Sequence, residues 1–178
     1  MTAWAIRRAD PASDHDLRAL CDVLIDCVEG GASVSFMLPM TRDKAERFWR
    51  AALEGAACGD RIILVAEDGD GIAGTVTVLL SQPENQPHRG DIAKMLVLRR
   101  ARRQGLGERL LAAAEKVAHE AGKCLLVLDT VTGGDAERLY ARANWQRCGV
   151  IPGYALWPDG RRCATTVFYK FVDGTVRV

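Results

Sequence analysis

The chain has 178 residues, 48% apolar and 26% charged, which is typical of a globular protein with one substantial core. Its 24 basic and 23 acidic side chains nearly cancel, so we expect no general attraction to nucleic acid or to a membrane. The sequence shows no signal peptide, no apolar run of about 20 residues and no linker between domains. We therefore expect one cytoplasmic domain over residues 1–178.

Apolar periodicity and turn residues predict seven strands and four helices. Helices are expected over 14–27, from Thr41 to about residue 57, and over 106–121 and 135–143. Strands are expected over 3–9, 61–66, 72–80, 90–98, 124–128, 150–154 and 165–171. The run 124–128 is continuously apolar, as in a strand that is covered on both faces.

One glycine pattern in the second and third strands invites a different interpretation. Gly69-Asp70-Gly71-Ile72-Ala73-Gly74 has the glycine spacing of a dinucleotide-binding loop, which would make the protein an oxidoreductase. That loop must be followed by a helix, whereas Thr75-Val76-Thr77-Val78-Leu79 alternates as a strand does. We therefore interpret the glycines as a hairpin turn. A Gly-Lys-Ser/Thr phosphate loop is also absent from the sequence.

A second glycine-rich turn lies between the strand 90–98 and the helix 106–121. Gly105 and Gly107 permit a tight turn and close approach of a phosphate to backbone N–H groups at the helix N-terminus. Four arginines at 99, 100, 102 and 103 add positive charge. The six cysteines and three histidines have no metal-ligand spacing, so we expect no metal.

Arg102-Arg103-Gln104-Gly105-Leu106-Gly107 resembles the Arg/Gln-x-x-Gly-x-Gly/Ala signature of the GNAT N-acetyltransferases. The segments 91–98 and 136–145 are similar to the family's fourth strand and late helix, although Arg99 replaces a usual proline and Asn144 a usual glycine. A closer likeness over about 30–170, through Gly30-Gly31-Ala32-Ser33-Val34 and Pro152-Gly153-Tyr154 among others, is to tabtoxin resistance proteins. These members of the family acetylate an amino-acid-like toxin.

The resemblance implies a GNAT fold of the α/β (α+β) class. Its mixed, mostly antiparallel sheet of about seven strands would split between the fourth and fifth strands and be flanked by about four helices. It also implies an acetyl-CoA-dependent N-acetyltransferase that acts on a small-molecule primary amine through a ternary complex, as a monomer or homodimer. A noncatalytic acyl-CoA-binding regulatory module is the alternative.

The resemblance further implies roles for individual residues. The late-helix Tyr140 would protonate the departing thiolate, and Asp129 would bind the acceptor ammonium or accept its proton. Asp91 occupies a place where some members carry a base, although a solvated strand-end aspartate is the simpler interpretation. The residues expected to bind acetyl-CoA are Leu96, Val97, Leu98, Arg102, Arg103, Gln104, Gly105, Leu106, Gly107 and Glu108. Those expected to bind the acceptor are Ser33, Phe36, Asp129 and Tyr154.

Overall fold

A computed structural model describes residues 4–174. The helices are α1 (Asp14–Glu29), α2 (Arg42–Ala57), α3 (Leu106–Glu120) and α4 (Asp135–Arg142), with a short 3₁₀ turn at Arg99–Ala101. The strands are β1 (Ala5–Arg8), β2 (Arg61–Asp68), β3 (Gly71–Leu79), β4 (Arg89–Val97), β5 (Leu125–Val131), β6 (Gln146–Leu156) and β7 (Arg162–Phe171).

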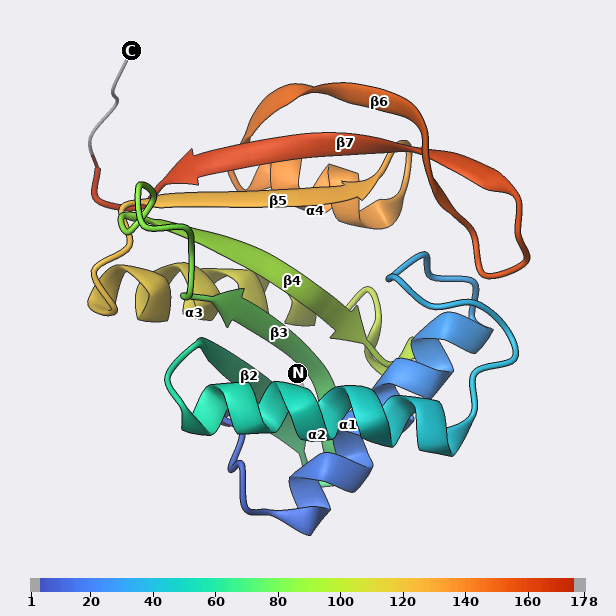
Figure 1. Ribbon diagram of the computed structural model, residues 1–178. Coiled ribbons are helices and arrows are strands. Elements are labelled where there is room, and N and C mark those ends of the chain that lie inside the picture. The colour runs from blue at the N-terminus through green and yellow to red at the C-terminus, as the bar shows by residue number, and fades with distance from the viewer. Residues whose placement is uncertain (1–3, 175–178) are drawn as a thin grey trace.

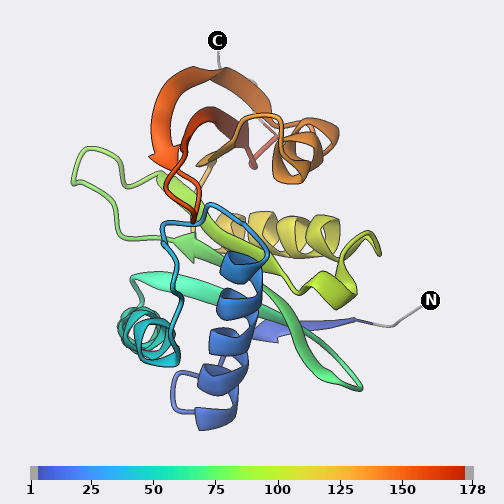
Figure 2. The same ribbon diagram turned by 90° about the vertical axis from the view of Figure 1, so that its right-hand side faces the viewer.

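The seven strands form one sheet in the order β1-β2-β3-β4-β5-β7-β6. All neighbouring pairs are antiparallel except β4 and β5, which are parallel. Helices α1 and α2 cover one face of the sheet, and α3 and α4 pack on the other (Figures 1 and 2). The predicted mixed sheet and its four helices are confirmed.

Local signals in the sequence explain where the helices begin and end. The Ser13 hydroxyl accepts from the Asp16 N–H at the start of α1, and the Thr41 hydroxyl accepts from the Lys44 N–H at the start of α2. Asn144 ends α4 with a φ of 63°, in the left-handed region that asparagine tolerates better than most residues. Between these limits each helix has one apolar side, and it buries that side against the sheet.

Strands β4 and β5 separate soon after they begin. Only Arg89, Gly90 and Asp91 pair with β5, opposite the stretch 125–127. On its other side β4 carries a bulge, because Thr75 and Thr77 of β3 pair with Leu96 and Ala93. Between these two pairs, one residue of β3 therefore faces two of β4, and Lys94 within the bulge has a φ of 49°. The split that the resemblance implied between the fourth and fifth strands is confirmed.

The largest difference from the expected elements is at β6, which runs from Gln146 to Leu156 rather than over 150–154. Gly149, Pro152 and Gly153 suggest an interrupted strand, but β6 is an edge strand that pairs only with β7, and its register shifts twice. An edge strand tolerates proline and bulges because one row of its backbone groups has no strand partner. Residue 3, where the first strand was expected to begin, lies outside the described residues.

Within the pattern Gly69–Gly74, Gly69 and Asp70 form the turn that joins β2 to β3, and Gly71 already begins the strand β3. Its interpretation as a hairpin turn is therefore confirmed. None of the helices in the range 4–174 has the length and apolar content needed to span a bilayer.

A buried ion pair ties the start of α1 to the β1 edge of the sheet. Asp16, 2% exposed, accepts from Arg7 Nη1 at 2.7 Å, from Arg7 Nη2 at 2.9 Å and from the Asp10 N–H at 2.9 Å. Arg7 also donates to Glu67 on β2. The hydrogen bonds from Arg7 lower the pKa of Asp16 from 3.8 to about 2.

This pair predicts a defined dependence of stability on pH. Because the folded-state pKa of Asp16 lies below its ordinary value, the stabilisation is complete above about pH 4 and is lost as the pH falls toward 2. Asp16→Asn should lower the free energy of unfolding by about 2 kcal/mol at pH 7 and by progressively less below pH 4. Urea unfolding at several pH values measures this change. Asp22→Asn, on the same helix as Asp16, breaks an exposed ion pair with Arg42 of α2 and should change stability by less than about 0.5 kcal/mol.

Candidate active site

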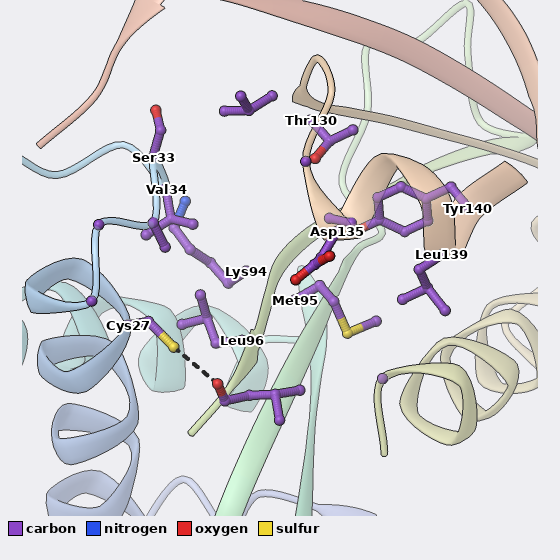
Figure 3. Close-up of a pocket in the computed structure, with 18 of the residues that line it drawn as sticks. Cys27, Ser33, Val34, Lys94, Met95, Leu96, Thr130, Asp135, Leu139 and Tyr140 are labelled. Atoms are coloured by element: carbon purple, nitrogen blue, oxygen red, sulfur yellow. Dashed lines mark hydrogen bonds between the residues drawn. The ribbon is translucent and has the colours of Figure 1, made fainter. Parts of the chain in front are cut away.

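A cleft of about 880 Å³ opens where β4 and β5 diverge. One wall comes from β4, the end of α1 and the loop 30–37, and the other from β5, α4 and the β6–β7 hairpin. The N-terminus of α3 closes one end of the cleft. Figure 3 shows Lys94 beside Ser33 and Val34, with Thr130 and Tyr140 across the cleft from them.

The turn before α3 presents a row of unbonded N–H groups to the cleft. Within the described residues, no backbone N–H from 103 to 108 donates to a protein acceptor, whereas the N–H of Arg109 donates to the Gly105 carbonyl. Arg103 and Gly105 have φ values of 63° and 77°, which bends the chain so that successive N–H groups converge. Together with the positive end of the α3 dipole, these groups can bind a pyrophosphate.

The four arginines around this turn divide into two pairs. Arg102 and Arg103 line the cleft, as the prediction requires. Arg99 binds Asp26 and Arg100 binds Asp68, and neither arginine is among the cleft residues. The outer pair therefore fixes the turn to α1 and β2, and the inner pair supplies charge to the cleft.

Beyond its bulge, β4 presents the backbone of Val97 to the cleft. The Leu98 N–H donates to the Ala73 carbonyl of β3 at 2.9 Å. Because backbone groups alternate in direction along a strand, the N–H and C=O of Val97 point away from β3 and into the gap. There the Val97 carbonyl accepts from Arg102 Nε at 3.1 Å. Leu98 does not line the cleft, so Val97 is better placed than Leu98 to bind a ligand with its backbone.

Tyr140 lies at the wall formed by α4, with 4% of its surface exposed. Its ring packs against Trp145 at 5.9 Å and Phe168 at 6.0 Å between centroids. Burial, followed by the negative charge of Asp129, raises the pKa of Tyr140 above its ordinary range. Its hydroxyl makes no hydrogen bond to any described residue. The phenol is therefore protonated at neutral pH and free to donate a hydrogen bond into the cleft.

Asp129 and Lys94 carry opposite charges on the two walls. Asp129 is exposed to the open cleft; partial burial of its carboxyl raises its pKa, and Lys94 opposes that shift. Burial lowers the pKa of Lys94, and Asp129 opposes that shift. A carboxylate whose pKa is raised is a stronger base than an ordinary aspartate, which suits proton transfer near neutral pH.

The remaining residues expected in the site have varied placements. Ser33, Phe36 and Tyr154 line the cleft, but the Ser33 hydroxyl donates to the Leu156 carbonyl at 2.7 Å and so joins the loop 30–37 to β6. Gln104 lies outside the cleft and donates to the Arg100 carbonyl. Asp91 also lies outside and forms an ion pair with Arg89.

Lys94 is the main residue that the sequence analysis missed. The available signal was a single cation within the otherwise apolar run from Ile92 to Leu98. In a regular strand its direction would follow from alternation, but the bulge removes that regularity. Among residues 4–174, no three His, Cys, Asp or Glu side chains come together in a way that could hold a metal ion.

The sequence is also similar to known proteins. The Acetyltransferase (GNAT) family profile matches residues 21–149. An uncharacterized N-acetyltransferase of Azospirillum brasilense is 31% identical over 131 residues, which is 72% of this chain and 76% of that protein.

Two solved structures share the fold. The protein yncA of Salmonella typhimurium, solved with its cofactor acetyl-CoA, superposes with a TM-score of 0.81 at 19% identity, over 99% of this chain and 98% of that one. A ribosomal-protein-alanine N-acetyltransferase of Brucella melitensis gives a TM-score of 0.77 at 24% identity, over 94% and 99% of the two chains. With its split sheet, its unbonded turn before α3 and its match to the family profile, the chain belongs to the GNAT family of acetyltransferases.

Proposed function

We propose that the protein is an acetyl-CoA-dependent N-acetyltransferase that transfers the acetyl group directly to the primary amine of a small molecule. One observation carries the proposal. The unbonded N–H groups at residues 103–108 open into the same cleft as Asp129 and Tyr140, so an anionic cofactor and two proton-transfer groups share one space.

The described residues fit acetyl-CoA along the length of the cleft. The turn 103–108 would bind the pyrophosphate, with Arg102 and Arg103 beside it, and the backbone of Val97 would bind the pantetheine arm between β4 and β5. When bound, acetyl-CoA supplies an activated thioester carbonyl. A backbone N–H near Met95 or Leu96, at the bulge, is the proposed donor to the carbonyl oxygen as negative charge develops on it.

Two side chains would move the protons. Asp129 would hold the acceptor amine and accept its proton directly or through a water molecule. Tyr140 would donate a proton to the sulfur of the leaving coenzyme A, for which its protonated state and unbonded hydroxyl are suited. Because the Tyr140 ring is held by Trp145 and Phe168, the hydroxyl would reach the sulfur without a costly rearrangement.

The other end of the cleft supports a small-molecule acceptor. The Ser33 hydroxyl joins the loop 30–37 to β6 there, and both segments line the cleft. The likeness of segments in this region to tabtoxin resistance proteins supports an amino-acid-like acceptor, a toxin or antimetabolite among them. Asp91 is a weaker candidate than Asp129 for the base, because its carboxylate already binds Arg89 and Gln82 outside the cleft.

Cofactor binding can be tested by thermal stability. At about 100 times its dissociation constant, acetyl-CoA should stabilise the fold by about 2.7 kcal/mol, which raises Tm by about 5–10 °C in a chain of this size. NAD and ATP at the same concentration should raise it by less than about 2 °C, since neither has a pantetheine arm to fill the gap beside β4. Differential scanning fluorimetry measures the three shifts. A larger shift with NAD than with acetyl-CoA would contradict the proposed cofactor.

The role of Tyr140 can be tested by removing only its hydroxyl. Tyr140→Phe keeps the packing against Trp145 and Phe168, so the affinity for acetyl-CoA should change by less than about threefold. Turnover should fall by about 10²- to 10⁴-fold where chemistry limits the rate, because the general acid is lost. Single-turnover acetylation of the best acceptor provides the measurement. Parental turnover in this variant would assign Tyr140 a purely structural role.

The role of Asp129 can be tested through pH. In the parent enzyme, kcat/KM should fall as the pH is lowered through the raised pKa of Asp129, because protonation removes the base. Asp129→Asn should lower kcat/KM by about 10²- to 10⁴-fold at neutral pH and abolish this acid limb. Asp91→Asn is the matched control and should stay within about threefold of the parent. The reverse ranking of the two variants would make Asp91 the base.

A further inference from the structure

Lys94 occupies an unusual backbone position at the acceptor end of the cleft. It lies in the bulge of β4 with a φ of 49°, and it donates to the Ser35 hydroxyl at 3.2 Å. Ser35, in the loop 30–37, also has a positive φ, of 75°. A non-glycine residue in the left-handed region costs roughly 1 kcal/mol, and such strain concentrates at functional sites. Here two such residues meet in one hydrogen bond.

The half-buried ammonium of Lys94 is only partly satisfied. Besides Ser35, its neighbours are the rings of Phe36 at 5.9 Å and Phe48 at 5.4 Å from Nζ to centroid. No carboxylate in the range 4–174 lies within ion-pairing distance, and Asp129 acts on Lys94 only as a more distant charge. An ammonium has three donors, of which Ser35 uses one. The Ser35 hydroxyl accepts from Lys94, so its own proton stays available for donation.

The other cations of the cleft lie elsewhere. Arg102 and Arg103 belong to the turn before α3, and Arg138 and Arg142 belong to α4, where Arg138 binds Asp135. Lys94 therefore provides the positive charge on the acceptor side of β4, and Asp129 provides a negative charge on β5. Figure 3 shows that Lys94 extends toward Ser33 and Val34, away from Tyr140. The charges of Lys94 and Asp129 would therefore contact different parts of a bound molecule.

We propose that Lys94, together with the Ser35 hydroxyl, binds the carboxylate of the acceptor, which is therefore a zwitterionic amino acid whose ammonium lies beside Asp129. This assignment rests on the proposed acetyl transfer and adds to it a residue that determines specificity. An acceptor amine that carries no carboxylate would leave the half-buried Lys94 ammonium without an anionic partner. A carboxylate at that place would complete the hydrogen bonds of the ammonium.

A purely structural role for Lys94 is the competing explanation. Its contacts with Phe36 and Phe48 fix the loop 30–37 to β4, and cation–π contacts of this kind contribute about 0.5–2 kcal/mol. Loss of such a contact would loosen the loop and lower the rate of acetylation of every acceptor alike. Loss of the ammonium that binds a carboxylate would lower the rate of acetylation only for acceptors that carry a carboxylate.

The test uses a panel of L-amino acids, each with its carboxamide and its decarboxylated amine, for example leucine, leucinamide and isoamylamine. The parent, Lys94→Met and Lys94→Arg are assayed for kcat/KM by thiol release and by mass spectrometry of the acetylated product. Methionine keeps the length and apolar stem of lysine, and arginine keeps the charge. Comparing ratios between variants cancels the different basicities of the amines. Arg142→Met, which removes an exposed cation from the α4 side of the same cleft, is the matched control.

In the parent, we expect the best acceptors to be amino acids. Lys94→Met should lower the ratio of kcat/KM for amino acid over carboxamide by about 10- to 100-fold, mainly through KM, with a fold stability within about 3 °C of the parent. Lys94→Arg should retain most of the ratio, and Arg142→Met all of it.

Three results would count against the assignment. Acetylation of amines without any preference for a carboxylate overturns the role of Lys94 and leaves the proposed function intact. An equal loss for all three acceptor types in Lys94→Met assigns Lys94 to the structure of the loop. The absence of acetyl transfer to every member of the panel, despite binding of acetyl-CoA, contradicts the proposed function itself.

Discussion

The divergence of β4 from β5 is the constraint on which the site depends. Three residue pairs join these strands, and beyond them a bulge bends β4 toward β3. The backbone of Val97 has no partner in β5, and the gap beside it becomes the floor of the cleft. An unbroken β4–β5 ladder would have satisfied the same backbone groups with protein. The fold instead pairs the Val97 carbonyl with Arg102 and leaves the Val97 N–H facing the cleft.

The two ends of the cleft obtain their polarity in different ways. At the α3 end, the field comes mostly from backbone, through the unbonded N–H groups at 103–108 and the helix dipole. At the other end the field comes from two single side chains, Asp129 and Lys94. Burial raises the pKa of Asp129 and lowers the pKa of Lys94. A backbone site binds any pyrophosphate in the same way, whereas a pair of side chains can be exchanged by substitution. In the proposed enzyme, backbone groups would therefore determine cofactor binding and side chains would determine acceptor binding.

Packing around Tyr140 fixes the position of the proposed proton donor. Trp145 directly follows the left-handed Asn144, and its indole N–H donates to Glu115 of α3 at 2.8 Å, while Lys170 binds the other oxygen of Glu115. This network fixes the indole ring against which Tyr140 packs. The tyrosine ring is thereby held between Trp145 and Phe168 of β7, and its hydroxyl keeps its proton because ionisation in that setting is unfavourable.

The sequence by itself determined the order of the elements, the limits of the helices and the glycine turn before α3, because caps, glycines and apolar periodicity act within a few residues of one another. It also placed Asp129 and Tyr140 as residues of interest. It did not reveal that Arg99 and Arg100 turn away to distant aspartates, that Asp91 is held by Arg89, or that Lys94 enters the cleft. Those outcomes depend on which strands pair, where one of them bulges and which carboxylates lie within reach, and these are contacts that only the tertiary structure brings about.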